Sequence, residues 1–166
     1  MATNGDILLA YDGSDGAKAA IEAATRLFPG CSALVVSVWQ SVAAAAPASL
    51  IAVPAGVARK AYAELDEEAQ REAQELAEDG AAAARAGGLD AAARGVLCHG
   101  NTWATLVRLA EDERPAAIVV GSRGRSAVKS ALLGSVSSGV AHHSSVPVMI
   151  VPSPAGELDG EAGCPP

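Results

Sequence analysis

The segment AAIVVGSRGRSAVKSALLGS, residues 116–135, joins a short apolar run to a glycine-rich loop and then to the start of a helix. A run rich in β-branched residues predicts a buried strand, and glycines let a backbone approach a ligand closely. The helix start that follows offers unpaired N–H groups and a partial positive charge. The segment therefore predicts a strand, an anion-binding loop and a helix in succession, which is typical of an α/β protein.

The rest of the chain continues this alternation of strands and helices. We expect strands at 6–10, 33–38, 91–98, 116–120 and 146–151. Helices are expected at 15–28, at 57–86, between Asn101 and Pro115, and at 136–144. Continuous apolar strands that alternate with helices predict a doubly wound domain of three layers, in which helices cover both faces of a parallel five-stranded sheet.

Length and low-complexity segments set the domain organisation. A chain of 166 residues favours a single domain, which we place at 1–152. The Ala/Pro-rich stretch at 41–56 is expected to be a flexible insert, either a flap over a site or a disordered connection. The acidic tail at 153–166 has little to bury and is expected to be disordered. In the helix over 57–86, periodicity predicts one buried apolar side, which consists of Ala61, Leu65, Ala69, Ala73, Leu76, Gly80 and Ala83.

The charge balance and the cysteines exclude several classes of function. The net charge of −7 has the wrong sign for neutralising a nucleic-acid backbone. Three cysteines without Cys-x-x-Cys spacing predict neither a disulfide framework nor a zinc site and suit a reducing cytoplasm. Prolines and a glycine interrupt the uncharged stretch between Arg26 and Arg59, so we expect no membrane span. The sequence begins without the pattern of a secretion signal.

Two loops occupy the position where an open α/β sheet binds its ligand. Asp12 follows the strand at 6–10, and the glycine loop follows the strand at 116–120. Ligands bind at the carboxyl ends of parallel strands where the strand order reverses. If these strands are neighbours, Asp12 faces a phosphate-binding loop, where it would accept hydrogen bonds from a ribose or base, or bind a cation. The alternative is that Asp12 is only a turn residue ahead of the cap Ser14.

The helix that begins near Gly134 supports the anion-binding hypothesis. Its first turn contains two hydroxyl side chains, Ser135 and Ser137, and glycines precede it. These features indicate phosphate binding more strongly together than separately, since Gly134-Ser135 alone is also a common way to start a helix. The basic residues Arg123, Arg125 and Lys129 either add phosphate contacts or are solvated surface charges.

Binding is easier to derive from this sequence than catalysis. The chain has neither the Gly-x-x-x-x-Gly-Lys-Ser/Thr signature nor Gly-x-Gly-x-x-Gly after its first strand. His142 and His143 are adjacent on a predicted helix, so they point about 100° apart and cannot readily share a metal. His99 has no recognisable nucleophile beside it. We therefore expect no catalytic residue and no metal site.

The spacing of these motifs resembles a known family. Gly121-x-x-Gly124, nine further residues and Gly134-Ser135 are flanked by Ile118-Val-Val120 and by Val-Pro-Val-Met-Ile-Val at 146–151. Asp12-Gly-Ser14 follows the first strand. Over residues 6–151 the chain resembles the ATP-binding type of the universal stress protein family. The resemblance implies a sheet in the order 3-2-1-4-5 and ATP as the ligand, with Mg²⁺ as an optional cation.

The same resemblance implies a role for each candidate site residue. By similarity, Ala10, Tyr11 and Asp12 border the adenosine, Val38 offers main-chain hydrogen bonds to adenine, and Gly121 contacts the ribose. Gly124, Gly134, Ser135, Val136 and Ser137 are implied to hold the phosphates, and Arg123 is the added candidate from the loop.

The family resemblance also implies how such a protein acts. We expect a homodimer formed through the strand at 146–151, a regulatory function in stress response through an unidentified protein partner, and at most slow ATP hydrolysis. The alternative function is a nucleotide-independent dimeric scaffold, and a third is an enzyme that acts on an adenylated substrate. The chain departs from the family at the 41–56 insert and at Ser37-Val-Trp39, where many members have a His-Val pair.

Overall fold

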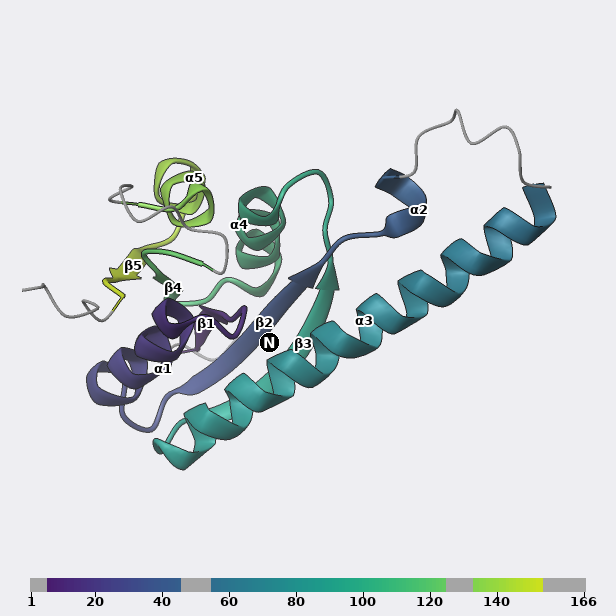
Figure 1. Cartoon of the computed structure of the whole chain (residues 1–166). Coiled ribbons are helices and arrows are strands. Elements are labelled where there is room, and N and C mark those ends of the chain that lie inside the picture. Colours follow the sequence, from purple (N-terminus) through teal and green to yellow (C-terminus); the bar gives the residue numbers. More distant parts are fainter. Residues whose placement is uncertain (1–5, 46–54, 125–132, 154–166) are drawn as a thin grey trace, which may run out of the picture.

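A parallel sheet lies between two layers of helices in the computed structural model, which describes residues 6–45, 55–124 and 133–153 (Figure 1). The strands are β1 (Ile7–Ala10), β2 (Ser32–Trp39), β3 (Asp90–Leu97), β4 (Ala117–Gly121) and β5 (Val148–Val151). Their order is β3-β2-β1-β4-β5, so the sequence prediction of the fold is confirmed. The order reverses between β1 and β4, which pair directly.

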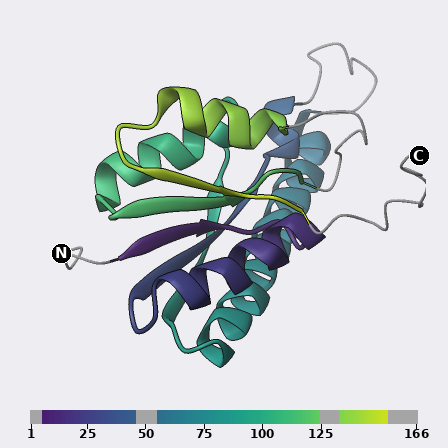
Figure 2. The ribbon, with the colours of Figure 1, turned by 90° about the vertical axis from the view of Figure 1, so that its left-hand side faces the viewer.

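Five helices connect the strands within the described residues: α1 (Asp15–Leu27), α2 (Val42–Ala45), α3 (Ala55–Ala86), α4 (Thr102–Glu113) and α5 (Ser135–His143). Helices α1 and α3 cover one face of the sheet, whereas α4 and α5 cover the other (Figure 2). Ser14 caps α1 by accepting a hydrogen bond from the Ala17 N–H, and Asn101 caps α4 in the same way through Ala104. No helix among the described residues is both long and apolar enough to cross a membrane.

The apolar core is divided by the sheet into two clusters. Successive side chains of a strand point to opposite faces, so Ile7 and Leu9 pack towards α1 and α3 while Leu8 packs towards α4 and α5. Val35 and Val36 divide between the two clusters in the same way. The central strands are therefore buried on both faces, which explains their continuous apolar runs.

Helix α3 contacts the sheet along only part of its length. On the predicted side Ala73 and Gly80 are buried, but Leu65 is 50% exposed and Ala61 and Ala83 are exposed, so the prediction for these three residues was wrong. The first half of the helix extends past the strands, as Figure 1 shows, and no strand lies there to bury Leu65. Where α3 lies beside the sheet, its buried side consists largely of small residues, which let the helix pack closely.

The start of the predicted insert is hydrogen bonded to α3. The Ser41 hydroxyl donates to Asp66 Oδ2 over 2.6 Å, and the Val42 N–H donates to Asp66 Oδ1 over 2.7 Å. These bonds, the Ser41 hydrogen bond foremost, hold the pKa of Asp66 below its ordinary value. A carboxylate from α3 thus caps α2 across 25 residues of sequence. Residues 46–54 and 154–166 lie outside the described residues, and with them the expectations of a flap and of a disordered tail.

Candidate functional site

A cavity of about 630 Å³ opens at the carboxyl ends of β1, β2 and β4. The structure brings all the sequence-predicted site residues together around it: Ala10, Tyr11, Asp12, Val38, Gly121, Arg123, Gly124, Gly134, Ser135, Val136 and Ser137. The cavity lies beside the β1–β4 pair, where the strand order reverses. This is where an open α/β sheet binds its ligand, and the volume is in the range of small-molecule sites.

The apolar wall of the cavity includes residues that the sequence analysis did not single out. The additional lining residues are Ala17, Val36, Gln40, Thr102, Leu106, Val120 and Leu133. Val36, Val38 and Gln40 are spaced two residues apart along β2 and just beyond its end, so their side chains point to the same face. With Val38 at the cavity, the strand period of two therefore predicts Val36 and Gln40 there as well. Leu106 comes from the buried stripe of α4, and only the packing of α4 against the sheet reveals that this stripe reaches the cavity.

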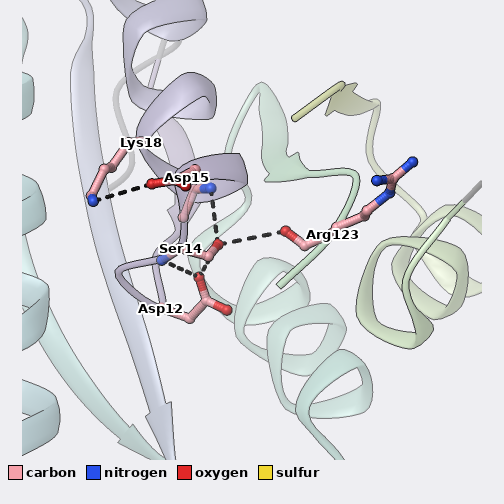
Figure 3. Close-up of polar contacts among 6 residues, drawn as sticks. Asp12, Ser14, Asp15, Lys18 and Arg123 are labelled. Atoms are coloured by element: carbon pink, nitrogen blue, oxygen red, sulfur yellow. Dashed lines mark hydrogen bonds and ion pairs between the residues drawn. The ribbon is translucent and has the colours of Figure 1, made fainter. Parts of the chain in front are cut away.

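Asp12 connects the end of β1 to the start of α1 (Figure 3). Its Oδ1 accepts hydrogen bonds from the Ser14 N–H, over 3.0 Å, and from the Ser14 hydroxyl, over 2.6 Å. The Ser14 oxygen in turn accepts the Ala17 N–H of α1 over 3.2 Å. Asp12 therefore has the turn role that the sequence left open, and it lines the cavity as well.

At the loop glycines, the position that a Cβ would occupy lies against other protein atoms. A Cβ on Gly124 would lie 2.7 Å from Asp12 Oδ2, and one on Gly121 would lie 2.5 Å from the carbonyl carbon of Gly16. A Cβ on Gly134 would lie 3.3 Å from the Ser122 carbonyl oxygen. The missing side chains therefore allow the loop to pack on β1 and α1, and the approach of the loop backbone to a ligand stays a prediction.

Helix α5 begins at the cavity without a side-chain cap. Gly134 is its N-cap residue, and no side-chain hydrogen bond caps the helix there. Ser135, Val136 and Ser137 form the first turn, and all three line the cavity. The N–H groups of a first turn have no partner within their own helix, so this turn presents donors and a partial positive charge.

The two serines of this turn differ in environment. Ser135 is exposed, whereas Ser137 is 2% exposed and its hydroxyl lies 3.0 Å from the carbonyl oxygens of both Ser122 and Gly134. The Ser137 hydroxyl therefore fastens the loop to α5. Of the two hydroxyls, the Ser135 hydroxyl is the more accessible to a ligand.

Arg123 supplies a buried cationic donor beside the same cavity. Its Nε is buried and has no hydrogen-bond partner among the described residues. The guanidinium points away from Asp12, while the backbone carbonyl faces Ser14 (Figure 3). A buried charged donor without a partner is costly, and an anion in the cavity would remove that cost. Arg125 and Lys129 lie outside the described residues.

Two of the three histidines, His142 and His143, contact other groups through their rings. His142 Nδ1 lies 2.8 Å from the Ser138 carbonyl oxygen, and the ring of His143 stacks on Trp103 with centroids 4.3 Å apart. His99 is exposed and does not line the cavity. Within 6–45, 55–124 and 133–153, no group of three or more His, Cys, Asp or Glu residues is placed to hold a metal ion. Among the residues described at the site, Asp12 therefore belongs to no cluster of acidic, histidine or cysteine side chains that could bind a cation.

The family model described as the universal stress protein family matches residues 3–152. No curated protein matches the sequence. Among solved structures, the hypothetical protein MJ0577 is 23% identical with a TM-score of 0.72, and the match covers 92% of this chain and 97% of that one. A universal stress protein in complex with cAMP is 25% identical with a TM-score of 0.61, covering 93% and 100%. A universal stress protein family protein from Arabidopsis thaliana with AMP bound is 19% identical with a TM-score of 0.61, covering 94% and 96%.

Proposed function

The chain belongs to the universal stress protein family, and from this premise we propose that it binds an adenine nucleotide, ATP in particular, in the cavity at the ends of β1, β2 and β4. The relatives in complex with cAMP and with AMP support an adenine nucleotide as the ligand class. The nucleotide-binding domain in this proposal comprises residues 1–152.

One observation carries the proposal. The uncapped first turn of α5 and Arg123, whose Nε has no hydrogen-bond partner within the described parts of the chain, line the same cavity as a wall of aliphatic side chains. The first two features suit phosphate, because backbone N–H groups and a guanidinium are both donors to anions. The aliphatic wall suits a base, which is flat and largely apolar on its faces.

The site then divides into two parts along the ligand. Val36, Val38 and Leu106 enclose the adenine, which receives main-chain hydrogen bonds from Val38, and Asp12 accepts from the ribose hydroxyls next to Gly121. Gly124, Gly134, Ser135, Val136 and Ser137 hold the phosphates with Arg123. Mg²⁺ is an optional cation that would enter the site bound to the phosphates of ATP. The described residues contain no group of three or more acidic, histidine or cysteine side chains that could hold a metal ion.

The biological role in this proposal is regulation. Occupancy of the cavity changes a surface that a partner protein recognises in the stress response, in the cytoplasm, with at most slow hydrolysis of ATP. The chain acts as a homodimer formed through β5, whose residues are all partly exposed at the edge of the sheet. The alternative is a dimeric scaffold that works without nucleotide, which the packing role of the loop glycines favours.

Isothermal titration with AMP, cAMP and ATP tests the proposal with a variant that removes one phosphate donor. Ser135→Pro deletes the first N–H of α5, and Gly134, at φ −75° and ψ 164°, already has the conformation that precedes a proline. Asp15→Pro is the matched control, because Ser14 has φ −68° and ψ 161° before the first residue of α1. Asp15 does not line the cavity.

We expect the wild type and Asp15→Pro to bind ATP alike and Ser135→Pro to bind it roughly tenfold more weakly, the effect of one hydrogen bond to a charged group. Folded wild-type protein that gives no heat with any of the three nucleotides would refute the proposal and favour the scaffold. Equal loss of affinity in both proline variants would contradict the proposal that the first turn of α5 binds the phosphates.

A further inference from the structure

Side chains from α3 hydrogen bond to the outer edge of β3 between Ala91 and Gly95. Strand β3 ends the sheet and pairs with β2 alone. The Asp90 N–H donates to the Cys31 carbonyl over 3.1 Å, and the Cys98 N–H donates to the Trp39 carbonyl over 2.7 Å, so even-numbered residues direct their backbone groups towards β2. Because neighbouring residues of a strand direct these groups to opposite sides, the odd-numbered residues from 91 to 95 direct theirs outwards.

The amide of Gln74 binds two of these outward groups. Gln74 Oε1 accepts the Gly95 N–H over 2.8 Å, and Gln74 Nε2 donates to the Ala93 carbonyl over 3.4 Å. A third group is bound by Arg85, whose Nη1 donates to the Ala91 carbonyl over 2.7 Å. Each outward-facing residue from Ala91 to Gly95 thus has one backbone group that is hydrogen bonded to a side chain of α3.

The Gln74 pattern is that of a residue in a neighbouring parallel strand. Such a residue donates its N–H to one carbonyl of the adjacent strand and accepts an N–H from the residue two positions further along it. The carboxamide has one donor and one acceptor on the same carbon, and it meets Ala93 and Gly95 in this order. It occupies the place of a residue that would pair opposite Arg94.

Glycine at position 95 brings α3 close enough for this contact. A Cβ on Gly95 would lie 3.0 Å from the Gln74 backbone nitrogen and 3.3 Å from the Ala73 carbonyl carbon. The backbone of α3 therefore lies directly against β3 at this point, and the side chain of Gln74 needs to reach only around the edge.

The opposite edge of the sheet has no such closure among the described residues. Ile118 N–H donates to the Pro147 carbonyl and Ser122 N–H to the Val151 carbonyl, so Val148 and Ile150 direct their backbone groups away from β4. No side chain of the described residues hydrogen bonds to those outward groups. Exposed strand edges accept further strands, and proteins that remain discrete block the edges they do not use.

We propose that Gln74 serves as a one-residue substitute for a sixth strand, which prevents β3 from pairing with a strand of a second molecule and leaves β5 as the edge that accepts one. The role is independent of the proposed nucleotide binding, since neither Gln74 nor any residue of β3 lines the cavity. Without this closure both edges of the sheet would be open, and molecules could join edge to edge without limit.

The test compares Gln74→Leu with Gln70→Leu by amide hydrogen exchange and by sedimentation velocity. Gln70 is exposed on α3 one turn earlier and makes no side-chain hydrogen bond within the described residues, so its variant matches the change in polarity. In Gln74→Leu we expect the Gly95 amide to exchange at least tenfold faster and species larger than those of the wild type to grow with concentration. Gln70→Leu should match the wild type in both measurements.

Gln74→Glu keeps the acceptor for the Gly95 N–H, so Gly95 should stay protected in that variant and the protein should stay the size of the wild type. Unchanged exchange of Gly95 in Gln74→Leu would overturn the proposal. So would rapid exchange without any larger species up to the highest soluble concentration, because the edge would then be open and still not pair. A titration of Gln74→Leu with ATP separates this result from the nucleotide proposal, since the two can fail independently.

Discussion

Gly16 of α1 and Gly121 of β4 touch backbone to backbone, and a Cβ added to Gly121 would lie 2.5 Å from the Gly16 carbonyl carbon. A Cβ on Gly16 would in turn lie 2.5 Å from the Arg123 carbonyl oxygen. The first turn of α1 is therefore seated on the point where β4 becomes the glycine loop. This contact sets the position of Asp12 relative to the loop, because the Ser14 cap that Asp12 holds belongs to the same turn.

Gly121→Ala should lower the free energy of unfolding by about 1–3 kcal/mol, the usual cost of overpacking, because backbone atoms at 2.5 Å cannot yield as a flexible side chain does. Gly134→Ala is the matched control, since its Cβ would be 3.3 Å from the nearest atom and needs a shift of only a few tenths of an ångström. Urea unfolding measures both. Equal stability of the two variants would show that the contact between α1 and β4 is not tight.

Arg123→Met should weaken ATP binding by roughly tenfold or more while adenosine binding changes little, because methionine keeps an aliphatic stem and loses the donors to phosphate. The free energy of unfolding should fall little, since the substitution leaves no hydrogen-bond partner of Nε unsatisfied among the residues that the structure describes. Arg108→Met, an exposed position outside the cavity, is the control. A similar loss for ATP and adenosine would place Arg123 away from the phosphates.

Acid should release the cap that joins α2 to α3. The pKa of Asp66 is lowered in the folded protein, chiefly by the Ser41 hydroxyl, so the stabilisation by this carboxylate is complete above the ordinary pKa of 3.8 and is lost as the pH falls through the lowered value. Carbon-detected NMR of the carboxyl group measures this titration. Ser41→Ala should move the pKa of Asp66 upwards, whereas Ser145→Ala should leave it unchanged, and an unmoved pKa in Ser41→Ala would contradict the assignment.

Gly139→Ala should displace the indole of Trp103 and break its stacking on His143. A Cβ on Gly139 would lie 2.3 Å from Trp103 Cγ, and the two rings now stack with an interplanar angle of 18°. The indole N–H and the His143 ring signals in an NMR spectrum should both shift, and stability should fall by about 1–3 kcal/mol. Ser138→Ala, on the preceding residue of α5, should leave both signals in place. A Gly139→Ala spectrum that overlays on the wild type would refute the close packing of α4 on α5.

Most of the fold could be predicted because its central strands are buried on both faces. The run at 116–120, for example, is continuously apolar and lacks the alternation of apolar and polar residues that is typical of an antiparallel sheet. Pro29 and Pro115 mark where two of the helices end. The positions of Asp12 and the glycine loop followed from the rule that the carboxyl ends of neighbouring parallel strands share an edge, whereas Ala10, Tyr11, Val38 and Val136 came from the family resemblance.

The contacts that the sequence did not reveal are those between distant segments. Helical periodicity shows which side of α3 is apolar but not where the sheet ends, so Leu65 was assigned to a core that does not reach it. Glycine residues are visible in the sequence, but the atom that each one faces is not, as Gly124 beside Asp12 shows. Gln74 and Asp66 are polar residues on a charged helix, and only the folded chain shows the backbone groups they bind.

The division of the apolar interior by the sheet has a consequence for ligand binding. Ala10, Val36, Val38, Leu106, Val120 and Val136 line the cavity and all belong to the cluster on the α4 and α5 side or pack against it. A base bound against this wall would extend the interior of that layer. Tyr11 and Ala17 also line the cavity and belong to the cluster on the α1 and α3 side, so a ligand there would contact both layers of the interior.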